Sequence, residues 1–131
     1  MQKLLDRVLL IEDDPDQVHI YKTLFDLDDS VDLMIATNGQ DGLAIAKAGE
    51  PDIILLDLVM AEMDGGQVLK FLKKDKDTKD VPVVILSNLY EEGIKDKYIK
   101  KGAIDYWLKT EIMPGQALVK IKEILHQIRI E

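Results

Sequence analysis

Short apolar segments alternate along the chain with longer segments of helical period. Five segments have the length of strands and are rich in Val, Ile or Leu: Val8–Ile11, Asp32–Ala36, Ile53–Leu56, Val83–Leu86 and Tyr106–Leu108. Helical stretches are expected to begin near Pro15, Gly39, Gly65, Glu91 and Pro114. Continuous apolar strands separated by helices are typical of a parallel sheet that is buried on both faces. The pattern therefore predicts an α/β fold with a doubly wound sheet of five parallel strands and five helices.

Start and stop signals support several of these helices. Pro15 and Pro114 fit a first helical turn, where a missing N–H costs little. The last helix has one apolar face, formed by Ala117, Leu118, Ile121, Ile124, Leu125 and Ile128. Gly102 follows two lysines at the end of the fourth helix, which is a typical stop signal.

Length and composition indicate one domain, residues 1–131, in the cytoplasm. The chain is 47% hydrophobic and 32% charged, as in a globular protein. No apolar run approaches the ~18 residues that span a bilayer, so we expect no membrane association. The net charge of -8 argues against direct nucleic-acid binding. With no cysteine, any metal must be held by oxygen or imidazole, which favours hard cations.

Acidic residues follow two of the predicted strands. Glu12 and Asp13 follow the first strand and Asp57 follows the third, so all three should meet at one edge of the sheet. Crowded carboxylates raise one another's pKa unless a cation neutralises them, and oxygen ligands suit Mg²⁺ or Mn²⁺. The alternative is that acids here complement the positive end of the first helix. We prefer that alternative for Asp14 and Asp16.

A hydroxyl and an ammonium are expected at the same edge. Ser87 follows the fourth strand and Lys109 follows the fifth. Singly, a serine is more often a turn residue and a lysine a solvated charge. Around one carboxylate, however, a hydroxyl, a lysine and a cation would form a pocket for a phosphoryl group, because each stabilises charge on its oxygens.

An ordered set of segments resembles the receiver domains of bacterial response regulators, which act in two-component signalling. The likeness runs over nearly the whole chain, through residues 8–14, 51–60, 63–65, 82–87 and 101–109. Each segment is short, but their order is highly specific. The resemblance implies a flavodoxin-like, three-layer fold with strand order 2-1-3-4-5.

The resemblance also implies a role for each site residue. Asp57 would accept a phosphoryl group from a phosphohistidine of a sensor histidine kinase. Asp13 would bind Mg²⁺ directly, Glu12 mainly through water, and the Val59 backbone carbonyl would complete the ligands. Ser87 and Lys109 would contact the phosphoryl group, and Tyr106 would be the aromatic switch. The switch would change the face made by the fourth helix, fifth strand and fifth helix, which controls a downstream protein that the sequence does not identify.

Several positions depart from the family pattern. Thr110 replaces a proline that usually follows a cis bond, so we predict a trans bond and a somewhat altered lysine position. Asn88 replaces a small residue and could narrow access to the site. Ala61 replaces a common proline, which we expect to relax the loop after Asp57. Val59 and Leu89 are apolar and cannot orient an attacking water, so we expect slow self-catalysed hydrolysis.

Other functions remain as alternatives. A receiver that lost its switch would be a phosphorylation-independent interaction module, which Thr110 and Asn88 favour. An aspartate-based phosphatase would need an acid where Val59 stands. A flavin-binding protein would need small, uncharged residues where residues 12–16 are acidic. The chain is not expected to be an enzyme beyond its own phosphorylation and dephosphorylation, and both homodimerisation and membership of a longer chain are left open.

Overall fold

The structure is a computed structural model that describes residues 5–130. Five strands form one sheet: β1 (Asp6–Ile11), β2 (Val31–Ala36), β3 (Ile53–Leu56), β4 (Val83–Ser87) and β5 (Asp105–Leu108). Five helices alternate with them: α1 (Pro15–Phe25), α2 (Gly39–Gly49), α3 (Gly65–Lys74), α4 (Ile94–Lys100) and α5 (Pro114–Ile130). All strand pairs are parallel and the order is β2-β1-β3-β4-β5. The predicted fold class and strand order are confirmed.

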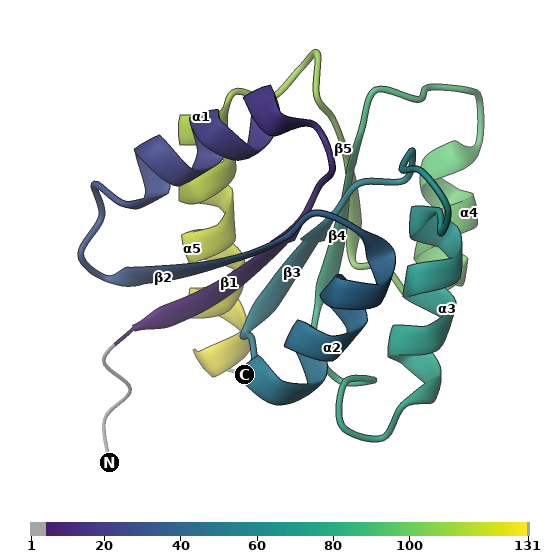
Figure 1. The fold of residues 1–131 in the computed structure, drawn as a ribbon, viewed down its shortest axis with the longest axis horizontal. Helices are drawn as coiled ribbons and strands as arrows, with labels where there is room; N and C mark the ends of the chain where they lie inside the picture. Colours follow the sequence, from purple (N-terminus) through teal and green to yellow (C-terminus); the bar gives the residue numbers. More distant parts are fainter. Residues whose placement is uncertain (1–4, 131) are drawn as a thin grey trace.

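The helices form a layer on each face of the sheet (Figure 1). Side chains of β1 alternate between the layers, because successive residues of a strand point to opposite faces. Val8 and Leu10 belong to the core beneath α1 and α5, which includes Phe25 and Ile121. Leu9 and Ile11 belong to the core beneath α2, α3 and α4. The central strands are therefore buried on both faces, as their continuous apolar sequences predict.

Helix boundaries follow local sequence. Asp14 caps α1 by accepting a hydrogen bond from the Asp16 N–H at 3.0 Å. Gly102 has a φ of 113°, a left-handed conformation that costs glycine little, and it ends α4 as predicted. The predicted start of α4 near Glu91 is wrong, because the helix begins at Ile94 after Gly93, whose φ is 82°.

The structure also bears on membrane association. Among residues 5–130, no helix combines the length and the apolar character that a membrane crossing requires.

Candidate functional site

The sheet brings Glu12 and Asp57 side by side. Ile11 and Leu56, the last residues of β1 and β3, are partners in the parallel register. The pairing continues past the strand ends, since the Asp57 N–H donates to the Ile11 carbonyl at 3.0 Å. The next residue of each strand therefore reaches the same edge.

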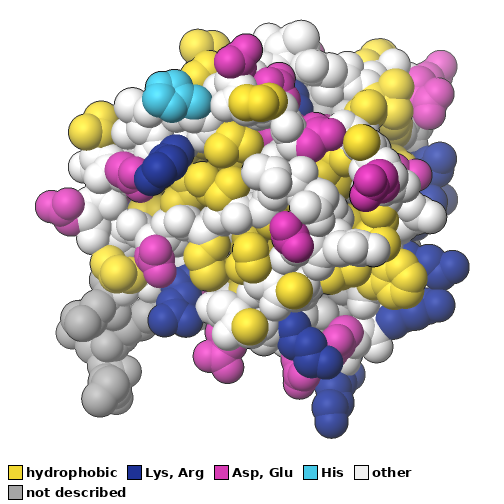
Figure 2. All heavy atoms as spheres, in the orientation of Figure 1, with side chains coloured by type: hydrophobic (Ala, Val, Ile, Leu, Met, Phe, Trp, Pro, Cys, Tyr) yellow, Lys and Arg dark blue, Asp and Glu magenta, His cyan; other side chains and the backbone are white. Residues whose placement is uncertain are grey.

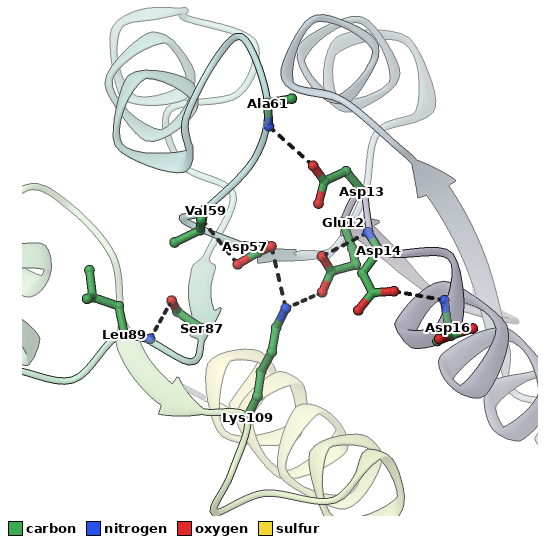
Figure 3. Close-up of polar contacts among 10 residues, drawn as sticks. All are labelled: Glu12, Asp13, Asp14, Asp16, Asp57, Val59, Ala61, Ser87, Leu89 and Lys109. Carbon is green, nitrogen blue, oxygen red and sulfur yellow. Dashed lines mark hydrogen bonds and ion pairs between the residues drawn. The ribbon is translucent and has the colours of Figure 1, made fainter.

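Three carboxylates meet at this edge (Figure 3). One oxygen each of Glu12, Asp13 and Asp57 lies within 4.8 Å of the others. Glu12 is 1% exposed and Asp57 is 5% exposed. The structure thus brings together the three acids that the sequence predicts, and buries two of them.

Burial, and to a smaller extent the nearby Asp57 carboxylate, raise the pKa of Glu12 from 4.5 to about 7. The hydrogen bond and positive charge of Lys109 act in the opposite direction without offsetting these effects. Both causes follow from simple electrostatics, because a poorly solvated carboxylate beside another acid is costly to ionise. The site therefore has more negative charge than its own cation neutralises.

Lys109 supplies that cation from the end of β5. Its ammonium donates to Glu12 and lies 3.4 Å from Asp57 Oδ2. Burial lowers the pKa of Lys109, but the hydrogen bond to Glu12 and the charge of Asp57 outweigh it, so the net pKa is raised. The bond between Lys109 and Thr110 is trans, as predicted. The trans bond leaves the ammonium within reach of both acids.

Neighbouring acids in the loop after β1 have different uses. The Asp13 carboxylate accepts a hydrogen bond from the Ala61 N–H at 3.2 Å. Asp14 points to the helix start and caps α1, in line with the alternative preferred for it. Proline at position 61 would lack this N–H, so alanine here links the two loops beside the site. That Ala61 relaxes its loop without abolishing function stays a prediction, and the structure adds this contact.

Ser87 and Tyr106 form hydrogen bonds with the segment after β4. Ser87 is fully buried, and its Oγ accepts a hydrogen bond from the Leu89 N–H at 3.1 Å. The Tyr106 hydroxyl donates to the carbonyl of the same Leu89. The Tyr106 ring is 7% exposed, and burial raises the pKa of its hydroxyl. The backbone N–H and carbonyl of Leu89 are thus hydrogen-bonded to Ser87 and Tyr106, two residues that the sequence predicts as site residues.

Two apolar side chains flank the carboxylates. Val59 is 65% exposed and Leu89 is 44% exposed. The Val59 N–H donates to Asp57 at 3.3 Å. Sequence reasoning missed the backbone groups of Ala61 and Leu89 as hydrogen-bonding partners. Backbone groups are the same in all residues except proline, so the sequence does not indicate these contacts. The only signal is that position 61 is not a proline.

The donor set fits a hard divalent cation. All three clustered side chains offer carboxylate oxygens, which Mg²⁺ and Mn²⁺ prefer. Asp13, at the open side of the cluster, is not engaged by Lys109, whereas Glu12 is. The excess negative charge gives the cation an electrostatic reason to bind. Binding of the metal by the Val59 backbone carbonyl stays a prediction.

The sequence profile of the response regulator receiver domain matches residues 8–121. This chain belongs to the response regulator receiver family. Receiver domains accept phosphoryl groups in two-component signalling, bind Mg²⁺ or Mn²⁺ at an acidic pocket, and interact with sensor kinases and downstream effectors. They are in general not catalytic. The match to a protein-glutamate methylesterase of Carboxydothermus hydrogenoformans spans only 34% of that enzyme.

Curated relatives agree with this assignment. The chain is 32% identical to Protein PilH of Pseudomonas aeruginosa over 79% of this chain and 84% of that protein. It is 40% identical to the transcriptional regulatory protein CiaR of Streptococcus pneumoniae over 87% of this chain and 51% of that protein. The chain thus spans most of PilH but only about half of CiaR.

Solved structures agree as well. The receiver domain of the Francisella response regulator 1452 superimposes with a TM-score of 0.84 at 27% identity, covering 94% of this chain and 98% of that one. The Mn²⁺-bound form of response regulator Rcp1 superimposes with a TM-score of 0.72 at 25% identity, covering 85% and 86%. These structures support the fold.

Proposed function

We propose that Asp57 of this receiver accepts a phosphoryl group from a sensor kinase phosphohistidine with the help of Mg²⁺ or Mn²⁺. The observation that carries the proposal is the meeting of Glu12, Asp13 and Asp57, with the Lys109 ammonium beside Glu12 and Asp57. Glu12 is hydrogen-bonded to Lys109 and almost inaccessible, and Asp13 accepts a hydrogen bond from the Ala61 N–H. Asp57 lies 3.4 Å from the Lys109 ammonium and beside the Val59 N–H, so it is best placed as the acceptor.

In the transfer, an Asp57 carboxylate oxygen forms a bond to phosphorus while the bond from phosphorus to the kinase histidine nitrogen breaks. The histidine departs with the electron pair of that bond. Lys109 neutralises negative charge on the phosphoryl oxygens, and the Ser87 hydroxyl and Val59 N–H can donate hydrogen bonds to them. A bound divalent cation would add charge neutralisation, held by Asp13 and Asp57 with Glu12 acting through water.

The response would begin at Ser87. A Ser87 hydroxyl that donates to a phosphoryl oxygen must reorient, which changes its hydrogen bond with the Leu89 N–H. The Leu89 carbonyl is in turn held by Tyr106, so the change reaches the proposed switch. Tyr106 lines a groove of about 640 Å³ along α4, β5 and α5, together with Trp107 and Ile112. A downstream protein would recognise this face.

The acyl phosphate should be long-lived. Val59 and Leu89 are exposed beside the site and have no polar side-chain atoms to orient a water molecule. The decay rate of the phosphorylated chain measures this. A marked slowing in Val59→Ala or Leu89→Ala would contradict it, because those variants remove no group that could direct water.

Intact-mass measurement after incubation with acetyl phosphate and Mg²⁺ tests the acceptor. We expect the mass gain of one phosphoryl group in the unmodified chain and none in Asp57→Asn. Asp16→Asn is the matched control, because Asp16 is an exposed acid in the same region and should leave the gain intact. A gain that persists in Asp57→Asn would show that another residue is the acceptor.

A second candidate is an interaction module that works without phosphorylation. Two departures from the family pattern, Thr110 and Asn88, favour it. The same mass measurement decides, since a module of this kind would gain no phosphoryl group. In either case we propose a single domain, located in the cytoplasm, that contacts proteins rather than membranes or nucleic acids, and homodimerisation stays open.

A further inference from the structure

Charge is distributed unequally along this acidic chain. Residues 1–69 hold 15 acids and only four Lys or Arg, whereas residues 70–101 hold nine lysines and six acids. Residues 70–101 include most of α3 and all of α4. Figure 2 shows Lys and Arg side chains gathered along the right-hand edge of the molecule, where Figure 1 places these two helices.

Four lysines from these helices define what we call the α3–α4 lysine surface: Lys70, Lys97, Lys100 and Lys101. All four are exposed, and within residues 5–130 none has a carboxylate within ion-pair distance. Other lysines do form such pairs, including Lys22, Lys47, Lys95, Lys109 and Lys122. The four lysines of the α3–α4 lysine surface therefore form no ion pairs within residues 5–130, although Asp64 and Glu91 act on Tyr98 from nearby.

Contacts between the helices place Lys70 beside α4. A Cβ atom on Gly66 would lie 3.6 Å from the Tyr98 hydroxyl, and one on Gly102 would lie 2.9 Å from the Lys73 side chain. Gly66, Lys70 and Lys73 are spaced four and three residues apart, so they share one side of α3. Because both ends of that side lie close to α4 or to Gly102 just beyond it, Lys70 faces α4 as well.

The Tyr98 ring lies beneath two lysines of this surface. The ammonium groups of Lys97 and Lys101 lie 5.6 and 5.3 Å from the centroid of its ring. The same ring lies near Tyr106, with centroids 6.0 Å apart. A ligand on the α3–α4 lysine surface would therefore rest on the residue that touches the proposed switch.

We propose that the α3–α4 lysine surface binds an acidic segment of a partner protein. Four unpaired cations on adjacent helices attract carboxylates and accelerate their encounter with the surface. The net charge of -8 disfavours long polyanions such as nucleic acid, and likewise anionic membranes, because both would also face the acid-rich remainder of the chain. A short acidic segment can contact the lysines alone.

Titration of the full chain with a fluorescein-labelled oligoglutamate peptide at low ionic strength tests the proposal, with fluorescence anisotropy as the readout. We expect saturable binding that weakens as salt is added, because exposed charges are screened. The triple variant Lys70→Glu, Lys97→Glu, Lys101→Glu should weaken binding by about tenfold or more. The control Lys74→Glu, Lys76→Glu, Lys79→Glu makes the same change in net charge at exposed lysines outside the surface, and should weaken it by only about twofold.

Three outcomes would overturn the proposal. The first is the absence of binding to the peptide, and the second is an equal loss in the two triple variants. The third is tighter binding of a DNA oligomer of equal charge, which would favour nucleic acid. Circular dichroism checks that each variant folds, as exposed substitutions should allow. Phosphorylation by acetyl phosphate should persist in both variants, so failure here is distinguishable from failure of the proposed function.

Discussion

Lys109 and Lys122 each pair with a carboxylate distant in sequence, but in opposite surroundings. The side chains of Lys109 and Glu12 are 11% and 1% exposed, whereas those of Lys122 and Asp28 are 40% and 23% exposed. At the buried pair the acid has a pKa raised to about 7, and at the surface pair it has a pKa lowered to about 2. The difference lies in burial and in the number of acids that share each lysine.

The two pairs have different consequences for function. Asp28 receives hydrogen bonds from Lys122 and Ser30, which fully stabilise its charge. Glu12 shares Lys109 with Asp57 and lacks the solvent that would stabilise its charge. The surface pair of Lys122 and Asp28 is electrostatically balanced and attaches α5 to the loop that contains Asp28. The buried group of Glu12, Asp57 and Lys109 still requires a cation. Five predictions test and extend this contrast, in order of decreasing effect.

Substitution of Lys109 should have the largest effect on stability. Lys109→Met leaves two buried carboxylates without their cation, so the free energy of unfolding in EDTA should fall by about 3 kcal/mol. Added Mg²⁺ should restore part of the loss. Urea denaturation with and without Mg²⁺ measures both effects. Lys122→Met is the control. An equal fall in the free energy of unfolding for the two substitutions would show that the buried and the surface pair do not differ in this way.

Glu12 should make the metal-free chain sensitive to pH. Its folded-state pKa of about 7 lies above the ordinary 4.5, so the folded state favours the protonated form. The resulting stabilisation is complete below pH 4.5 and is lost as pH rises through about 7, by about 3 kcal/mol. Urea denaturation in EDTA across this range should show the decline. Glu12→Gln should flatten it, and an unchanged slope would assign the effect to another group.

The proton that Glu12 binds competes with Mg²⁺ for the acidic cluster. Since binding requires an ionised carboxylate, Mg²⁺ affinity should weaken as pH falls below about 7. Calorimetric titration with Mg²⁺ at several pH values measures this dependence.

Substitution of Ala61 tests the link to Asp13. Ala61→Pro removes the N–H that holds the Asp13 carboxylate, so Mg²⁺ affinity should fall by about tenfold, as when partners that orient metal ligands are lost. Ala61→Gly keeps the N–H and should bind Mg²⁺ almost normally. Calorimetric titration compares the three chains. Equal affinity in all of them would mean that the hydrogen bond does not orient Asp13.

The surface pair should give the smallest effect. Asp28→Asn removes the ion pair with Lys122 and should lower the free energy of unfolding by about 1 kcal/mol near neutral pH. The pKa of Asp28 is lowered from 3.8 to about 2, so this contribution is present above pH 3.8 and is lost as pH falls through about 2. A double-mutant cycle with Lys122→Met measures the coupling, and its absence would show that the pair contributes nothing.

Most of the fold could be predicted because buried strands have a simple signature. β1, β3 and β4 are continuous apolar runs buried on both faces, and the sequence locates all three. β2 gave a weaker signal because it is an edge strand with only Ala36 fully buried. The start of α4 could not be predicted, because a glycine conformation rather than a capping side chain sets it.

The site was predicted at the level of which residues meet. Strand ends decide that Glu12, Asp57 and Lys109 share an edge, and the topology of the sheet guarantees it. The sequence could not predict that Lys109 would donate to Glu12, since this depends on side-chain conformation and burial. It also could not predict the contacts of the Ala61 and Leu89 backbones, because every residue other than proline has the same groups.

We propose that the acidic cluster needs a divalent cation before Asp57 can accept phosphorus. Intact-mass measurement gives the extent of phosphorylation by acetyl phosphate as Mg²⁺ is added to an EDTA-treated sample. We expect no phosphoryl gain in EDTA, a gain that saturates with Mg²⁺ or Mn²⁺, and a shift to higher Mg²⁺ concentration in Asp13→Asn. Full phosphorylation in EDTA would show that no divalent cation is needed.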